Sequence, residues 1–103
     1  MGNLGYGAFA THPGEVLKEE IKERGISQRQ LAESTGMTYS VISEILNGRR
    51  PLTEKTALIF EAALDIPAES LMSLQTKYNL QTARNDTSFA SILNSIKKIA
   101  AVF

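Results

Sequence analysis

The sequence predicts an all-α protein, and three observations carry this prediction. Apolar residues recur at helical spacing along most of the chain, and no stretch alternates apolar and polar residues with the period of two typical of a half-buried strand. Residues 28–47, QRQLAESTGMTYSVISEILN, have the pattern of two short helices joined by a tight turn. Proline and glycine separate the remaining helical segments. We therefore predict a five-helix domain over residues 12–84 and an amphipathic C-terminal helix within residues 85–103.

The bulk composition restricts the class of protein. With 103 residues, 43% of them hydrophobic and 21% charged, the chain is expected to form one small soluble domain. It contains no Cys and a single His, which excludes disulfides and thiolate sites, so we expect no enzyme activity, no metal and no cofactor. No apolar run approaches the roughly 20 residues of a membrane span, and the start lacks a signal-peptide core. We expect a cytoplasmic protein.

Residues 1–11 contain three glycines, with Leu4, Tyr6 and Phe9 between them. This composition is typical of a flexible N-terminal arm, and the alternative is that the aromatic side chains dock on a partner. The glycines do not form a phosphate-binding loop, because no Lys-Ser/Thr ending and no preceding strand accompany them.

The first helix is expected to begin at residues 11–13 and to end at Arg24. Pro13 suits the first helical turn, and Gly25 is a stop signal. We expect His12 to cap the helix or to pack at its start. The residues expected to be buried by this helix are Val16, Leu17 and Ile21.

The second and third helices follow the rules of a helix-turn-helix. Ser27 and Gln30 have the spacing of a capping box, and the small Ala32 allows the two helices to approach closely. Gly36 lies in the turn, where a positive φ is accessible to a residue without Cβ, and Thr38 can cap the third helix. This arrangement usually places the third helix in the major groove of DNA. The third helix is expected to bury Val41, Ile42, Ile45 and Leu46 and to end at Gly48.

Two further helices complete the predicted domain. The fourth begins after Pro51 with Thr53 as its N-cap, and the fifth follows Pro67 over about residues 68–82. The sequence 85–86, Asn-Asp, then interrupts the helical pattern. The inward residues are expected to be Ala57, Phe60, Ala63 and Leu64 in the fourth helix, and Leu71, Leu74, Tyr78 and Leu80 in the fifth.

The last segment carries a continuous apolar stripe at helical spacing. One interpretation is that this helix packs back onto its own domain. The other is that it pairs with a second subunit or another protein, which we favour because so wide an apolar stripe near a terminus often needs a partner. The residues predicted to make this dimer or partner contact are Phe89, Ile92, Leu93, Ile96, Ile99 and Phe103.

Several segments within residues 12–84 resemble the HigA family of antitoxins, which are Cro/repressor-type helix-turn-helix proteins. They are HPGE at residues 12–15, ILNGRRPLT at residues 45–53, and the LQ and YNL groups within residues 74–84. Two positions depart from the family: Leu71 stands where the family usually has Trp, and Asn79 where it commonly has Asp. Both replacements are compatible with the fold.

The resemblance implies a two-part function. Such antitoxins bind and neutralise a cognate HigB-like toxin, typically a small RNase that cleaves messenger RNA on the ribosome. They also bind their own operator DNA as homodimers and repress the operon. Two alternatives remain: a stand-alone or prophage-type repressor without a toxin partner, and a protein-interaction module that has lost DNA binding. The formal net charge of +0 keeps the last alternative open and argues against a non-specific DNA coater.

The motif geometry assigns roles to particular side chains. The start of the third helix faces base edges, so Tyr39, Ser40, Ser43 and Glu44 are the predicted base-reading residues. None of them can make the bidentate arginine–guanine contact, so the operator sequence is not predicted. We expect Arg29 to be solvated only. The predicted phosphate contacts come from Gln28, Thr38, Arg49 and Arg50.

Overall fold

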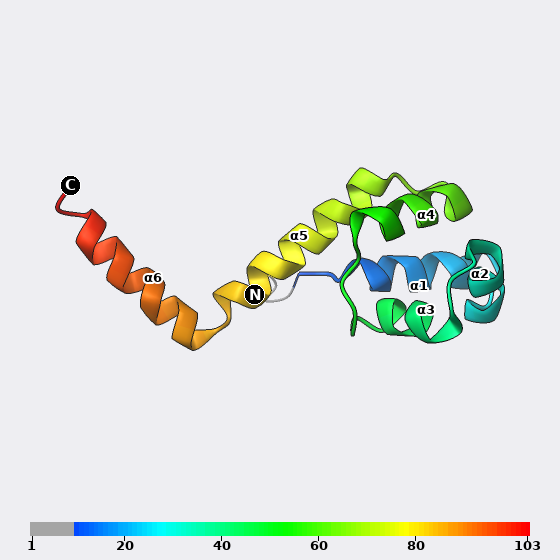
Figure 1. Cartoon of the computed structure of the whole chain (residues 1–103), viewed down its shortest axis with the longest axis horizontal. Helices are drawn as coiled ribbons and strands as arrows, with labels where there is room; N and C mark the ends of the chain where they lie inside the picture. The colour runs from blue at the N-terminus through cyan, green and yellow to red at the C-terminus, as the bar shows by residue number, and fades with distance from the viewer. Residues whose placement is uncertain (1–9) are drawn as a thin grey trace.

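The computed structural model describes residues 10–103, and this part of the chain contains six α-helices and no strand. The prediction of an all-α fold is confirmed. None of these helices is long and apolar enough to cross a membrane. The arm predicted for residues 1–11 lies, as far as residue 9, outside the described residues. The helices, shown in Figure 1, are α1 (Pro13–Glu23), α2 (Gln28–Thr35), α3 (Tyr39–Leu46), α4 (Glu54–Leu64), α5 (Ala68–Arg84) and α6 (Thr87–Ala100).

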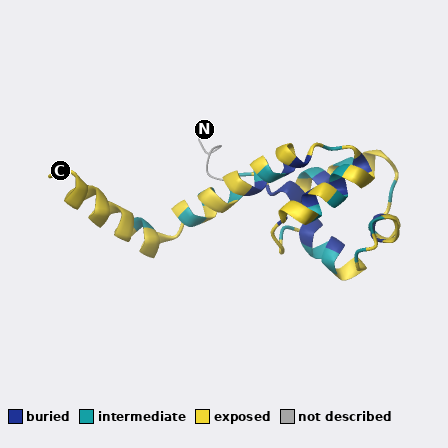
Figure 2. Ribbon diagram, turned by 45° about the horizontal axis from the view of Figure 1, so that its top comes forward, coloured by how far each residue is buried: buried dark blue, intermediate teal, exposed yellow. Residues whose placement is uncertain are grey.

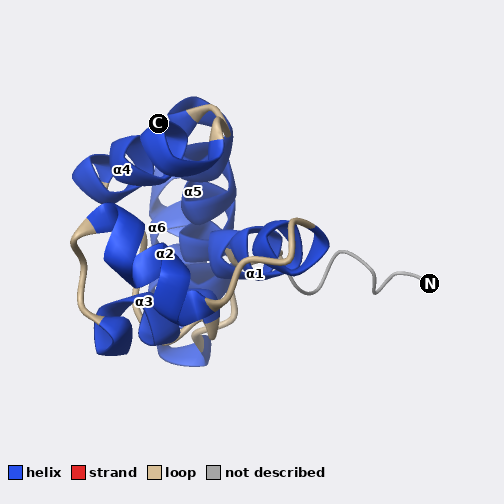
Figure 3. Ribbon diagram, turned by 90° about the vertical axis from the view of Figure 1, so that its right-hand side faces the viewer, coloured by secondary structure: helices blue, strands red, loops and turns tan. Residues whose placement is uncertain are grey.

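Helices α1 to α5 pack around one hydrophobic core, whereas α6 points away from it (Figure 1). Burying one large aliphatic or aromatic side chain contributes about 1.5–3 kcal/mol, so this cluster supplies most of the driving force for folding. Helix α3 packs against α1 and α2 and lies at the edge of the domain (Figure 3). The core consists of Leu17, Ile21, Leu31, Ala32, Ile42, Ile45, Leu46, Leu52, Ala57, Phe60, Leu64, Ala68 and Leu71.

Some details of the predicted core are wrong. Ala63 is exposed, because the buried face of α4 is set by Ala57, Phe60 and Leu64, and a neighbouring position is turned about 100° away. Leu80 is 47% exposed, because the C-terminal half of α5 extends beyond the domain (Figure 1). Smaller differences are that Val16 is only half-buried, that α1 ends one residue before Arg24, and that α5 continues to Arg84.

The HPGE segment joins the start of α1 to the end of α3. Nδ1 of His12 accepts a hydrogen bond from the backbone N–H of Gly14 at 2.9 Å, and the Glu15 carboxylate accepts one from the backbone N–H of His12 at 3.2 Å. These two contacts form a capping box. A Cβ on Gly14 would lie 1.9 Å from the carbonyl oxygen of Ile45, so only glycine permits this approach of α1 to α3. The segment therefore sets the position of α3 against α1.

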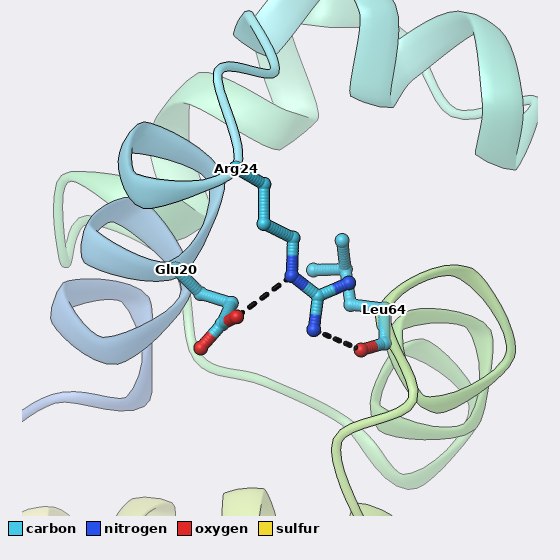
Figure 4. Close-up of polar contacts among 3 residues, drawn as sticks. All are labelled: Glu20, Arg24 and Leu64. Carbon is cyan, nitrogen blue, oxygen red and sulfur yellow. Dashed lines mark hydrogen bonds and ion pairs between the residues drawn. The ribbon is translucent and has the colours of Figure 1, made fainter.

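Arg24 makes the corresponding connection at the other end of α1 (Figure 4). Its Nε donates to the Glu20 carboxylate at 2.7 Å, and its Nη2 donates to the carbonyl oxygen of Leu64 at 2.6 Å. The last carbonyl groups of a helix have no partner within the helix, and a cation there also interacts favourably with the helix dipole. Arg24 thus satisfies the end of α4 and links it to α1.

Helix α6 does not pack on its own domain. Asp86 caps it, accepting from the backbone N–H of Phe89 at 3.1 Å, and its contacts are with α5. None of its residues is buried (Figure 2), and Phe103 is 98% exposed. The interpretation in which this helix covers its own domain is therefore wrong for the single chain. Within residues 10–103 the apolar stripe has no partner.

Candidate nucleic-acid interface

The turn between α2 and α3 has the local structure that its residues predict. The Ser27 hydroxyl accepts from the backbone N–H of Gln30 at 3.0 Å, and the Gln30 side chain accepts from the backbone N–H of Ser27 at 2.8 Å. Gly36 has a φ of 76°, in the left-handed region. The Thr38 hydroxyl accepts from the backbone N–H of Val41 at 3.3 Å and caps α3. These caps orient α3 relative to α2.

Helix α3 divides cleanly into a buried face and an outward face. Ile42, Ile45 and Leu46 are buried in the core. The four residues predicted to read bases share the opposite face, with Tyr39 and Ser40 exposed and the other two half-buried. This polar outward face consists of Tyr39, Ser40, Ser43 and Glu44.

Arg29 lies against this face, and the prediction that it is only solvated is wrong. Its guanidinium carbon is 5.1 Å from the centroid of the Tyr39 ring, a cation–π contact between α2 and α3. Such a contact contributes about 0.5–1 kcal/mol at an exposed site. It limits the freedom of the tyrosine and places a positive charge beside the outward face. No spacing rule predicts the contact, because the two residues belong to different helices.

A second pair connects a predicted base-reading residue with a predicted phosphate contact. Arg50 donates from Nε at 2.8 Å to the Glu44 carboxylate, and its Nη2 lies 2.7 Å from the same oxygen. The side chains are 48% and 41% exposed, so the pair contributes at most about 1 kcal/mol to stability. Its electrostatic effect is local. The guanidinium offsets a carboxylate that would otherwise repel phosphates.

Asn47 and Lys18 complete the surface, and neither residue was predicted to belong to it. The Asn47 amide donates to the Ser43 carbonyl at 2.8 Å and to its hydroxyl at 3.3 Å. Its Oδ1 accepts from Nζ of Lys18 at 2.9 Å. Asn47 therefore orients Ser43, one of the predicted base-reading residues, and holds a lysine of α1 near it. These two residues are 29 positions apart, so only the fold could reveal the contact.

The predicted phosphate-contacting residues border the same surface. Gln28 is the first residue of α2 and is half-buried, and Thr38 is the exposed cap of α3. Arg49 and Arg50 are exposed directly after α3, where Gly48 turns the chain with a φ of 73°. A capped helix-turn-helix, with a polar outward face and arginines at its margin, is the site of a DNA-binding protein.

His12 lies behind these arginines and is 3% exposed. Burial lowers the pKa of the imidazole, while a hydrogen bond with the backbone of Arg50 and the nearby Glu15 carboxylate act in the opposite direction. The ring meets Tyr78 of α5 edge-on, with centroids 4.9 Å apart. The prediction that His12 caps and packs at the start of the first helix is confirmed.

Known proteins share both the sequence pattern and the fold. The helix-turn-helix family model matches residues 17–71. Virulence-associated protein I of Dichelobacter nodosus is 36% identical over 85 residues, which cover 82% of this chain and 79% of that protein. The structure of a HigA-family addiction module antidote protein from Coxiella burnetii superposes with a TM-score of 0.73 at 30% identity, covering 87% of this chain and 94% of that one.

A second structure includes DNA. It is that of the Pseudomonas aeruginosa antitoxin HigA with the higBA promoter, which superposes with a TM-score of 0.72 at 28% identity and covers 86% of this chain and 92% of that one. The chain belongs to the helix-turn-helix family and, within it, to the HigA group of antitoxins. The resemblance inferred from residues 12–84 is confirmed.

Proposed function

We propose that this protein is an antitoxin that represses its own operon by binding operator DNA through α3, and that it also neutralises a HigB-like RNase toxin by binding it. The main support for DNA binding is the polar outward face of α3 and the cations that border it. The relative whose structure contains a promoter supports the same role. The antidote protein from Coxiella burnetii supports the toxin-binding part.

Within this proposal the side chains divide into two groups. Tyr39, Ser40, Ser43 and Glu44 contact base edges and decide which sequence is bound. The second group fixes the register of the protein on the duplex without reading sequence. It consists of Gln28, Thr38, Arg49 and Arg50, with Lys18 and Arg29 adding positive charge at the margin.

The division is tested by measuring operator binding over a range of salt concentrations. Replacing Arg49 and Arg50 together with Ala should weaken binding to all sequences and reduce the magnitude of the salt slope by about two units for each bound chain, at about 0.9 for each lost phosphate contact. Replacing Ser43 and Glu44 with Ala should instead change the preferred sequence. The matched control replaces Lys97 and Lys98 of α6, two cations remote from α3, and should keep the slope. Reversed behaviour of the two test variants would refute the assignment of roles.

We further propose that the protein is a homodimer and that α6 of a second copy covers the apolar stripe. Phe89, Ile92, Ile96, Ile99 and Phe103 alternate at spacings of three and four residues, which is the pattern of paired helices. The charged residues within α6 are two adjacent lysines near its end. Parallel pairing would bring these cations together, so antiparallel pairing is favoured electrostatically.

Two double variants of α6 test this dimer by light scattering. Ile92→Glu with Ile96→Glu places charges on the stripe and should produce monomers. The control, Ser91→Glu with Asn94→Glu, adds the same charge to the opposite face and should remain dimeric. If the Ile variant stays dimeric at the same concentration, α6 does not form the dimer contact.

The antiparallel arrangement has its own test, because the chain contains no native Cys. A single Cys at Ser95, which flanks the stripe near the middle of α6, should crosslink readily between two copies. A single Cys at Ser88, near one end, should not crosslink to its equivalent. Efficient crosslinking at Ser88 would instead indicate parallel pairing.

The toxin-binding part is tested by coexpression with a HigB-like toxin. The antitoxin should restore growth and co-purify with the toxin, and a toxin gene is expected next to its own. If operator binding is found but no such neighbour or complex exists, the stand-alone repressor is the better description. If a salt-dependent shift of DNA is absent as well, the chain is a protein-interaction module.

A further inference from the structure

Two polar side chains are buried among the described residues, and both are directed at the same loop. They are His12 and Gln75, each 3% exposed. A buried polar group is costly unless it is hydrogen-bonded, so the partners of such groups are well defined. Gln75 bonds to residues 48–52, the segment between α3 and α4 that carries Arg49 and Arg50, and His12 packs against the same segment. We call residues 48–52 the arginine segment.

Gln75 holds the arginine segment from α5. Its Oε1 accepts from the backbone N–H of Leu52 at 2.7 Å, and its Nε2 donates to Oδ1 of Asn79 at 2.8 Å. Both ends of the amide are therefore engaged, and the side chain cannot rotate without losing both bonds. Leu52 is itself buried, so its N–H has no access to water as a replacement partner.

His12 holds the arginine segment from the start of α1. Its Nδ1 accepts a hydrogen bond from the backbone N–H of Gly14, which fixes the ring at the start of α1. The ring also packs on Gly48, where a Cβ would lie 3.7 Å from Cγ of the imidazole. The arginine segment is thus held by Gln75 at Leu52 and by the packing of His12 on Gly48. The side chains of its two arginines remain exposed.

We propose that Gln75, assisted by His12, is a positioning residue that aligns Arg49 and Arg50 with the phosphates of the operator. Gln75 acts entirely through the backbone of the arginine segment. A charge-assisted contact to phosphate depends on short distances and favourable angles, so a small shift of this segment would weaken both arginine contacts together. The inference rests on the proposed DNA-binding function.

The test compares the salt dependence of operator binding in variants that are fully folded at the assay temperature. Gln75→Met keeps an unbranched side chain of similar length but loses both hydrogen bonds. It should reduce the magnitude of the salt slope by about one to two units for each bound chain, because each lost phosphate contact removes about 0.9. The matched control is Leu71→Ala, one turn earlier in α5, which loosens the core while leaving both hydrogen bonds of Gln75 in place. It should keep the wild-type slope.

A merely structural role would lower the folded fraction without changing the salt slope. An unchanged slope for folded Gln75→Met would therefore overturn the inference. If Gln75→Met does not fold, the salt slope of Asn79→Ala is measured instead. This substitution at an exposed position removes one hydrogen-bond partner of Gln75, so it should reduce the slope by a smaller amount. An unchanged slope in that variant also overturns the inference. Absence of salt-dependent binding in the wild type would instead contradict the proposed function itself.

Discussion

At the scale of single residues, Gly14 determines how closely two helices approach. Its backbone lies against the carbonyl oxygen of Ile45, in the last turn of α3. Since the atom opposing a new Cβ is backbone, no side-chain rotation can make room. The proline and the two capping residues around Gly14 place the start of α1 at this point.

Gly14→Ala is expected to destabilise the domain strongly. The added Cβ would lie 1.9 Å from the Ile45 oxygen, so α1 must move away from α3, at a loss of about 1–3 kcal/mol or more. Urea unfolding measures this loss. Glu19→Ala, an exposed substitution in the same helix, serves as the control and should change stability by less than about 0.5 kcal/mol. Equal stability of the two variants would contradict the close approach.

The buried His12 makes stability depend on pH. Its folded-state pKa is lowered from 6.5, chiefly by burial, so the folded chain binds a proton less readily than the unfolded chain. The stabilising contribution is therefore present above pH 6.5 and is lost as the pH falls below that value. Urea unfolding between about pH 8 and pH 5.5 should show this decline. His12→Asn retains a capping side chain that does not titrate, so its stability should vary less over the same range.

At the scale of elements, the helix boundaries follow from local chemistry and could be predicted. Ser27, Thr38 and Thr53 each accept a backbone hydrogen bond at the start of the helix they were predicted to cap. Such caps depend on residues three positions apart, which the sequence displays directly. The inward face of α5 was predicted less well, because Leu80 lies where the helix has already left the domain.

The cap that Arg24 provides for α4 is expected to matter more than its ion pair with Glu20. The ion pair is about one-third exposed on both sides and contributes at most about 1 kcal/mol, whereas the bond to the Leu64 carbonyl connects two helices. Arg24→Ala should therefore lower the free energy of unfolding by about 1–2 kcal/mol. Glu20→Ala should cost clearly less. Equal losses would show that the ion pair is the important contact.

At the scale of the whole molecule, α6 makes the chain elongated, with principal extents of 56 × 30 × 23 Å. The sequence predicted the stripe on this helix, and the part of the chain that the structure describes leaves it uncovered. A dimer through α6 would bring two DNA-binding domains into one molecule. It would also link dimerisation to operator affinity, because two linked domains bind a symmetric site together.

The candidate site could be predicted in part. The outward face of α3 follows from the helical period, so its four residues were found from the sequence. Arg29, Lys18 and Gln75 were not found, because each contacts a partner in another element that no spacing rule connects to it. Side-chain contacts between distant segments depend on how the helices pack, which the fold alone reveals.

We propose that two copies of α3, one from each protomer, read a symmetric operator. Footprinting of the protein on its own promoter, combined with a stoichiometry measurement, tests this most directly. We predict two protected half-sites about 34 Å apart, one helical turn of DNA, bound by two chains. Protection of a single, unrepeated half-site by one chain would contradict the claim.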